Sequence, residues 1–114
     1  MEEQLKQIIN HYGIMSQLKY IHSEYFELDE AILQHREISF NSEGDLGDIF
    51  ALKRATDHII EELADVMVML EQFRLYYDIP SMQITEIMKQ KIERQLKRIE
   101  EECKEQETKQ NLKE

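Results

Sequence analysis

The apolar run over residues 59–70 places the strongest constraint on how this chain can fold. It is the most apolar stretch of the sequence, yet Glu61 and Glu62 stand near its start and Asp65 lies inside it. A carboxylate in such a run is costly to bury unless a cation compensates its charge. The run therefore predicts a helix that is covered on several sides and that contributes acidic groups to a site.

The rest of the chain has a helical composition. Only three glycines and one proline occur in 114 residues, and Leu, Ile, Glu, Lys, Gln and Met, which favour helices, dominate the remainder. Apolar residues recur at helical spacing in three long segments. We therefore predict an all-α fold, an antiparallel helical bundle of four to five helices. Because the run over residues 59–70 is apolar nearly all round, we expect it to assemble into a homodimer or homotetramer.

Turn residues set the expected element boundaries. We predict helices over residues 3–12, 16–34, 55–77 and 82–105, with Ser16 as a cap and a loop over residues 36–47. Asp48 either caps a short helix through Lys53 or begins the next long helix directly. These elements are expected to form one helical domain over residues 1–105, followed by a polar tail over residues 106–114 that frays.

Charge and cysteine content limit the partners. Acidic residues outnumber basic ones by 24 to 14, which gives a net charge of −10 and disfavours binding to nucleic acid or to an anionic membrane. No apolar run approaches the ~20 residues of a membrane span. The single cysteine, Cys103, excludes a disulfide framework and fits a reducing cytoplasm. We therefore expect a cytoplasmic protein without nucleic-acid or membrane partners, which would need metal cations to handle phosphates.

Two acidic pairs stand apart from the other carboxylates. Glu24 and Glu27, and likewise Glu62 and Asp65, are three residues apart within strongly apolar helices. The apolar stripes of the two helices are Leu18-Ile21-Tyr25-Leu28-Ile32 and Ile59-Leu63-Val66-Leu70-Phe73. At about 100° per residue, Glu24 and Glu62 lie roughly 70–75° from the centre of their helix's stripe, and Glu27 and Asp65 roughly 130–135°, all in the same sense. If the two helices are antiparallel, equal offsets bring all of these carboxylates to the same side.

Oxygen ligands at this spacing suit Mg²⁺ or Mn²⁺ better than zinc or copper. The alternative is that these acids pair with Lys and Arg of the last helix, or stay solvated. Lys53 and Arg54 precede the acidic helix and are candidates for binding phosphate.

The same residues carry a resemblance to a known family. The chain resembles the MazG-like all-α nucleoside triphosphate pyrophosphohydrolases, a superfamily that also includes dimeric dUTPases and phosphoribosyl-ATP pyrophosphohydrolase. The resemblance covers roughly residues 12–77, with ExxE on one helix and ExxD on the next. It is carried by Tyr12-Gly13, Gln17-Leu18, Glu24-x-x-Glu27-Leu28, Ala31-Ile32 and Glu61-Glu62-Leu63-Ala64-Asp65-Val66.

The resemblance implies Mg²⁺-dependent hydrolysis of a (deoxy)nucleoside triphosphate to the monophosphate and pyrophosphate. The metal ligands that it implies are Glu24, Glu27, Glu62 and Asp65. It also implies that Glu24 or Glu27 takes the proton of the attacking water. Basic groups on the last helix of such enzymes often lie near the phosphates, and Lys91 and Arg94 are the candidates here.

The sequence departs from the family pattern in two places. Ser23 stands where many members carry an additional Glu directly before the ExxE, and the span from Glu27 to Glu62 is long for the signature. Two alternatives therefore stay open. One is a catalytically silent helical interaction or regulatory module, and the other is the same chemistry on dUTP or phosphoribosyl-ATP.

Overall fold

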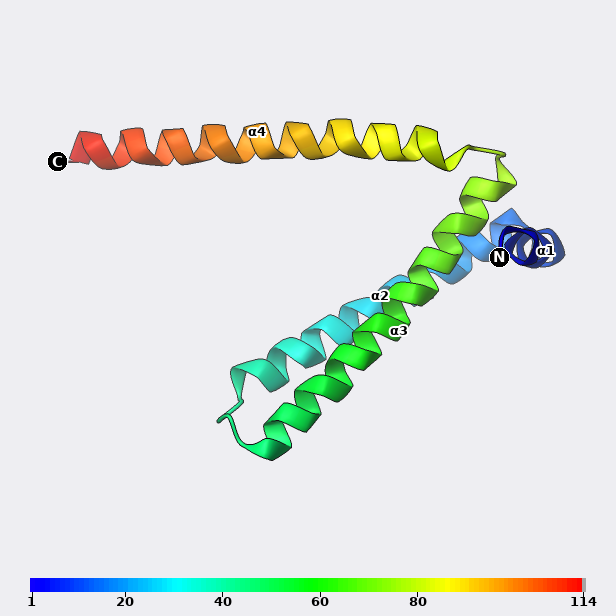
Figure 1. The fold of residues 1–114 in the computed structure, drawn as a ribbon, viewed down its shortest axis with the longest axis horizontal. Helices are drawn as coiled ribbons and strands as arrows, with labels where there is room; N and C mark the ends of the chain where they lie inside the picture. The colour runs from blue at the N-terminus through cyan, green and yellow to red at the C-terminus, as the bar shows by residue number, and fades with distance from the viewer. Residues whose placement is uncertain (114) are drawn as a thin grey trace. The chain divides into compact units, whose positions relative to one another are not determined.

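The computed structural model describes residues 1–113, which form four helices and no strand (Figure 1). The helices are α1 (Glu2–Tyr12), α2 (Ile14–Phe40), α3 (Leu46–Tyr76) and α4 (Ser81–Lys113). The chain divides into two compact units, one over Met1–Asp78 and the other from Ile79 onward. The all-α prediction is confirmed. None of the helices formed by residues 1–113 has an apolar stretch that would let it span a bilayer.

The first unit is built on the hairpin of α2 and α3. These two helices run antiparallel and pack along most of their length, and α1 packs against both of them, mainly against α3 (Figure 1). Leu5 and Ile9 of α1 are buried in this contact. Gly13 separates α1 from α2 with φ of 88°, a conformation that suits glycine. Its N–H donates to the Ile9 carbonyl oxygen at 2.7 Å, which closes the end of α1.

A buried arginine fastens the N-terminus of α1 to α3. The guanidinium of Arg74 is only 9% exposed, and its Nη2 donates to Glu71 at 2.8 Å and to Glu2 at 3.1 Å. The pairing lowers the pKa of the Glu71 carboxyl, chiefly through the hydrogen bond from Arg74. Arg74 thus joins two helices at the end of the hairpin that lies far from the α2–α3 loop.

The turn between α2 and α3 is shorter than predicted. Residues 36–40 belong to α2, not to a loop. The third helix, α3, runs without a break from Leu46, so the predicted start at residue 55 is too late, and Asp48 lies in the first turn of this long helix rather than capping a separate short one. The Asp45 carboxylate caps α3 by accepting from the Asp48 N–H at 2.8 Å, and Asp48 accepts in turn from the Glu43 N–H at 2.8 Å. Ser16 is not a cap, because α2 already begins at Ile14 after Gly13.

The face of α2 that packs on α3 coincides only in part with the predicted apolar stripe. Ile21 of that stripe is buried, whereas Leu18, Tyr25 and Ile32 are exposed. Gln17, Glu24 and Ala31, which are spaced by seven residues, are buried as well. The contact face is therefore rotated by about 60° from the predicted one. The contact face of α3 also differs from the predicted one. Val66 is buried as predicted, but Leu63 and Leu70 are exposed, while Glu62 and Met69 are buried.

The second unit consists of α4. This helix of 33 residues contains no buried residue. It continues through residues 106–113, where a frayed tail was predicted. Glu114, the end of that predicted tail, lies outside the described residues. The prediction of a single helical domain over residues 1–105 stays a prediction.

Candidate metal centre

The structure brings the two acidic pairs together between α2 and α3. One carboxylate oxygen from each of the four residues Glu24, Glu27, Glu62 and Asp65 lies within 4.8 Å of the other three. Because the helices are antiparallel, Glu24 lies beside Asp65 and Glu27 beside Glu62, and these neighbours repel one another electrostatically. The predicted convergence is thus present. We refer to these residues as the acidic cluster.

Two members of the acidic cluster lie deeper than predicted. Glu24 is 5% exposed and Glu62 is 8% exposed, so both belong to the contact face rather than to its flank. The Oε2 atoms of both residues are buried and accept no hydrogen bond from the residues described. Buried carboxylate oxygens are rarely left without a partner, because the loss of hydration is not repaid. Glu27 and Asp65 are exposed and close the cluster on its solvent side.

The environment disfavours the ionised form of the two buried acids. Burial raises the pKa of Glu24, and the charges of Asp65 and Glu27 raise it further, whereas the nearby Tyr20 hydroxyl lowers it. Burial also raises the pKa of Glu62, together with the charges of Glu27 and Asp65, while His58 acts in the opposite direction. A divalent cation among these oxygens would reverse the balance by favouring the ionised forms.

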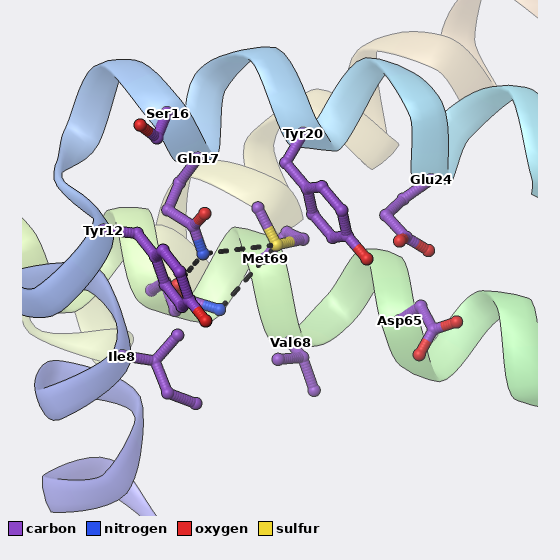
Figure 2. A pocket seen from close by; sticks show the side chains of 10 residues that line it. Ile8, Tyr12, Ser16, Gln17, Tyr20, Glu24, Asp65, Val68 and Met69 are labelled. Atoms are coloured by element: carbon purple, nitrogen blue, oxygen red, sulfur yellow. Dashed lines mark hydrogen bonds between the residues drawn. The ribbon is translucent and has the colours of Figure 1, made fainter.

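Two further side chains touch the cluster from opposite ends. The hydroxyl of Tyr20 faces the Glu24 carboxylate, and its interaction with that carboxylate is the main reason why the pKa of Tyr20 is raised (Figure 2). At the other end, Nδ1 of His58 lies 3.9 Å from Oε1 of Glu62, one turn earlier on α3. The acidic cluster therefore has a phenol on one side and an imidazole on the other.

A cavity of about 510 Å³ adjoins the cluster on the Tyr20 side and is lined by residues of α1, α2 and α3 (Figure 2). Glu24 and Asp65 form its wall toward the cluster. At its far end Nε2 of Gln17 donates to Oε1 of Gln72 at 2.8 Å, and Nε2 of Gln72 donates to the Met69 sulfur at 3.7 Å. The cavity thus combines apolar walls with two buried amides.

The four basic residues predicted to bind phosphate lie in different surroundings. Arg54 lines a second cavity, of about 300 Å³, together with His58 and Gln34. Lys53 is exposed and pairs with Asp57 at 3.9 Å. Lys91 and Arg94 lie on α4, in the second unit, and their role stays a prediction.

The sequence predictions did not include Tyr20, Gln72 or the cavity beside the cluster. A signal for the amides was present, because Gln17 stands seven residues before Glu24 and Gln72 stands seven residues after Asp65. Seven residues are about two helical turns, so both amides lie on the face of the acids and at the same level of an antiparallel pair. A prediction from hydrophobicity alone misses this matching spacing, because it does not consider where the polar amides lie.

Three comparisons with known proteins, against family models, curated proteins and solved structures, find no match. The assignment of function therefore depends on the residues of this chain.

Proposed function

We propose that this protein is a metal-dependent nucleotide pyrophosphohydrolase that cleaves (deoxy)nucleoside triphosphates to the monophosphate and pyrophosphate. The observation that carries the proposal is the convergence of Glu24, Glu27, Glu62 and Asp65, with oxygens within 4.8 Å of one another. The ExxE and ExxD motifs that contain them are those of the MazG-like enzymes, and this resemblance supplies the reaction class.

The acidic cluster fits a divalent cation. Its donors are all carboxylate oxygens, the ligands that Mg²⁺ and Mn²⁺ prefer. The Oε2 atoms of Glu24 and Glu62 are buried and have no hydrogen-bond partner among residues 1–113. A cation bound there would neutralise charge on the phosphates and acidify the attacking water.

The proposed reaction assigns a role to each of three side chains of the site. The water oxygen forms a bond to the α-phosphorus, the bond from that phosphorus to the bridging oxygen breaks, and pyrophosphate leaves. Glu24 or Glu27 takes the proton that the water loses. Tyr20, whose hydroxyl interacts with the Glu24 carboxylate, positions that carboxylate.

The proposal is tested by measuring pyrophosphate release from a panel of nucleoside triphosphates that includes dUTP, with phosphoribosyl-ATP added, in Mg²⁺ or Mn²⁺. We expect turnover that is abolished by EDTA and reduced at least about a hundredfold in Glu62→Gln and Asp65→Asn, as for other groups that stabilise charge in a transition state. Glu30→Gln is the matched control, because Glu30 is an exposed acid of α2 outside the cluster. Absence of metal-dependent turnover on every substrate would refute the enzyme proposal.

We also propose that the protein is a homodimer or homotetramer, as expected from the sequence. The exposed surface of α2 and α3 includes large apolar residues such as Tyr25, Ile32, Leu63, Met67 and Leu70. Extended exposed apolar surface is typical of a protein-contact face. The assembly would bury these residues in a helical bundle.

The same surface favours the second candidate function, a catalytically silent interaction module. In that case the apolar face of α2 and α3 would bind another protein, and the acidic cluster would be a remnant. The turnover assay separates the two, because a silent module releases no pyrophosphate in any metal.

A further inference from the structure

The acidic cluster lies between the two cavities, on one side of the α2–α3 hairpin. On α2 the residues Tyr20, Glu27 and Gln34 are spaced by seven, and on α3 the residues Ala51, His58, Asp65 and Gln72 have the same spacing. Residues seven apart share one face of a helix. The hairpin therefore carries a continuous band of sites on this side. The first cavity lies at one end, the acidic cluster in the middle and the second cavity at the other end.

The first cavity is suited to a flat, uncharged group. Its walls include the rings of Tyr12 and Tyr20 together with Ile8 and Val68, and its carboxylates are those of Glu24 and Asp65 (Figure 2). Among the described residues, no lysine, arginine or histidine lines it. A phosphate group placed here would meet only negative charge, whereas an aromatic base can stack on tyrosine rings.

The buried amides also give this cavity a hydrogen-bonding group that could contact the edge of a nucleobase. Nε2 of Gln17 is engaged with Gln72, but within the described part of the chain Oε1 of Gln17 accepts no hydrogen bond. This oxygen can accept from an N–H of a base. An amide whose other end is held by a neighbour is a well-positioned acceptor.

The second cavity has the opposite charge. It is lined by Arg54 and His58, and His58 also touches Glu62 of the cluster at 3.9 Å. Among the described residues no acid lies within ion-pair distance of Arg54, whereas its neighbour Lys53 is paired with Asp57. An arginine without a carboxylate partner, in a hollow beside a metal-binding cluster, is suited to phosphate oxygens.

We propose that the nucleotide lies along this band in one direction, with its base in the first cavity against Gln17 and Tyr12 and its terminal phosphates at His58 and Arg54. The α-phosphate then lies over the acidic cluster, and pyrophosphate leaves on the Arg54 side. This inference rests on the proposed function. It assigns Tyr12 and Gln17 to recognition of the base and Arg54 to recognition of the leaving group.

The test measures binding of the two products separately. Titration calorimetry with Mg²⁺ gives dissociation constants for inorganic pyrophosphate and for dAMP, dCMP, dGMP, dTMP and dUMP. Arg54→Gln should weaken pyrophosphate binding about tenfold and change monophosphate binding by less than about twofold. Tyr12→Ala should do the reverse, because a lost ring stack weakens binding of the base about tenfold or more.

Matched controls use the same residue types at exposed positions outside both cavities. Arg36→Gln removes the same charge from α2, and Tyr77→Ala removes an exposed ring at the end of α3. Neither should alter the binding of either product. Arg54, Tyr12 and both control residues are exposed, so the variants are expected to fold, which circular dichroism verifies.

The outcomes separate this inference from the proposed function. If the wild-type protein hydrolyses a triphosphate but Arg54→Gln weakens monophosphate binding, or both variants weaken both products equally, the direction is refuted and the enzyme proposal stands. If the wild-type protein hydrolyses no triphosphate and binds neither product, both are refuted.

Discussion

The side-chain amide of Gln17 on α2 donates a 2.8 Å hydrogen bond to the amide oxygen of Gln72 on α3. Both residues are buried, at 7% and 1% exposure, so the bond is shielded from water. Gln17 stands seven residues before Glu24, and Gln72 seven residues after Asp65. The bond therefore sets the register of the two helices about two turns from the acidic cluster. A slip of either helix would break it and separate the carboxylates.

We expect Gln72→Leu to destabilise the fold by about 1–3 kcal/mol, because it leaves the Gln17 amide buried without its acceptor. The double variant Gln17→Leu/Gln72→Leu should recover part of this loss, since no orphaned amide remains. Urea unfolding of the single and double variants measures the coupling between the two residues. Gln7→Leu, at an exposed position of α1, is the control. A double variant no more stable than additivity predicts would contradict the expectation.

The metal-free protein should lose stability as pH rises above about 4.3, the usual pKa of Glu in an unfolded chain. The pKa values of Glu24 and Glu62 are raised in the folded state. The folded state therefore binds more protons than the unfolded state, and stability falls until pH exceeds the raised values. The pKa of Glu71 is lowered, so its stabilising contribution is already complete above pH 4.3 and does not offset the loss.

Urea unfolding in EDTA between pH 5 and 8 measures this slope. Adding Mg²⁺ or Mn²⁺ should reverse it, because metal binding requires the ionised carboxylates. The variant Glu24→Gln/Glu62→Gln should show a weaker dependence of stability on pH and a higher melting temperature without metal. The reason is that it removes two buried carboxylates whose negative charges destabilise the metal-free fold. Stability that rises with pH in EDTA would be inconsistent with these pKa shifts.

Metal binding should depend on all four cluster residues. We expect Asp65→Asn and Glu27→Gln to weaken Mn²⁺ binding about tenfold or more, because each removes a charged ligand from the ion. Thermal shift against Mn²⁺ concentration measures the affinity. Asp29→Asn serves as the comparison, since Asp29 is an exposed acid of α2 outside the cluster. Equal weakening in Asp29→Asn would indicate diffuse attraction rather than a site.

Loss of the buried guanidinium should release α1 from the hairpin. Arg74→Met leaves Glu71 and Glu2 without their partner and should lower the melting temperature by several degrees. It should also speed tryptic cleavage after Lys6 in α1. The milder variant Glu2→Gln removes only one of the two ion pairs and should have a smaller effect. Cleavage at the wild-type rate in Arg74→Met would show that α1 is held by its apolar contacts alone.

A charge on the exposed apolar face should weaken self-association. We expect the wild-type protein to sediment as a dimer or tetramer, and Leu63→Lys to shift it toward the single-chain mass, because burying a lysine in an apolar interface is unfavourable. Leu63 is 43% exposed in the described chain, so the variant should keep its own helices. A wild-type mass equal to one chain would refute the oligomer.

The sequence by itself determined the helical class, the approximate helices and the four acidic residues. These features can be recognised within short stretches of sequence: few glycines and prolines, apolar residues at helical spacing, and two motifs with three-residue spacing. The convergence of Glu24, Glu27, Glu62 and Asp65 also followed from the sequence, given antiparallel helices. Helix ends were read less well, as residues 36–40 show, because no strong breaker stands there and the helix continues.

Only the tertiary structure decided which faces meet. Of the predicted stripe on α2, Ile21 is buried, but Leu18, Tyr25 and Ile32 are exposed. Gln17 and Glu24 are buried in their place. A helix with apolar residues on several sides has more than one face that it can bury, and the choice depends on what it packs against. The rotation that buries Glu24 and Glu62 also sets the Gln17–Gln72 bond and forms the two cavities. These features depend on residues that are distant in the sequence, such as Gln17 and Gln72, which are 55 positions apart, and no local pattern specifies them.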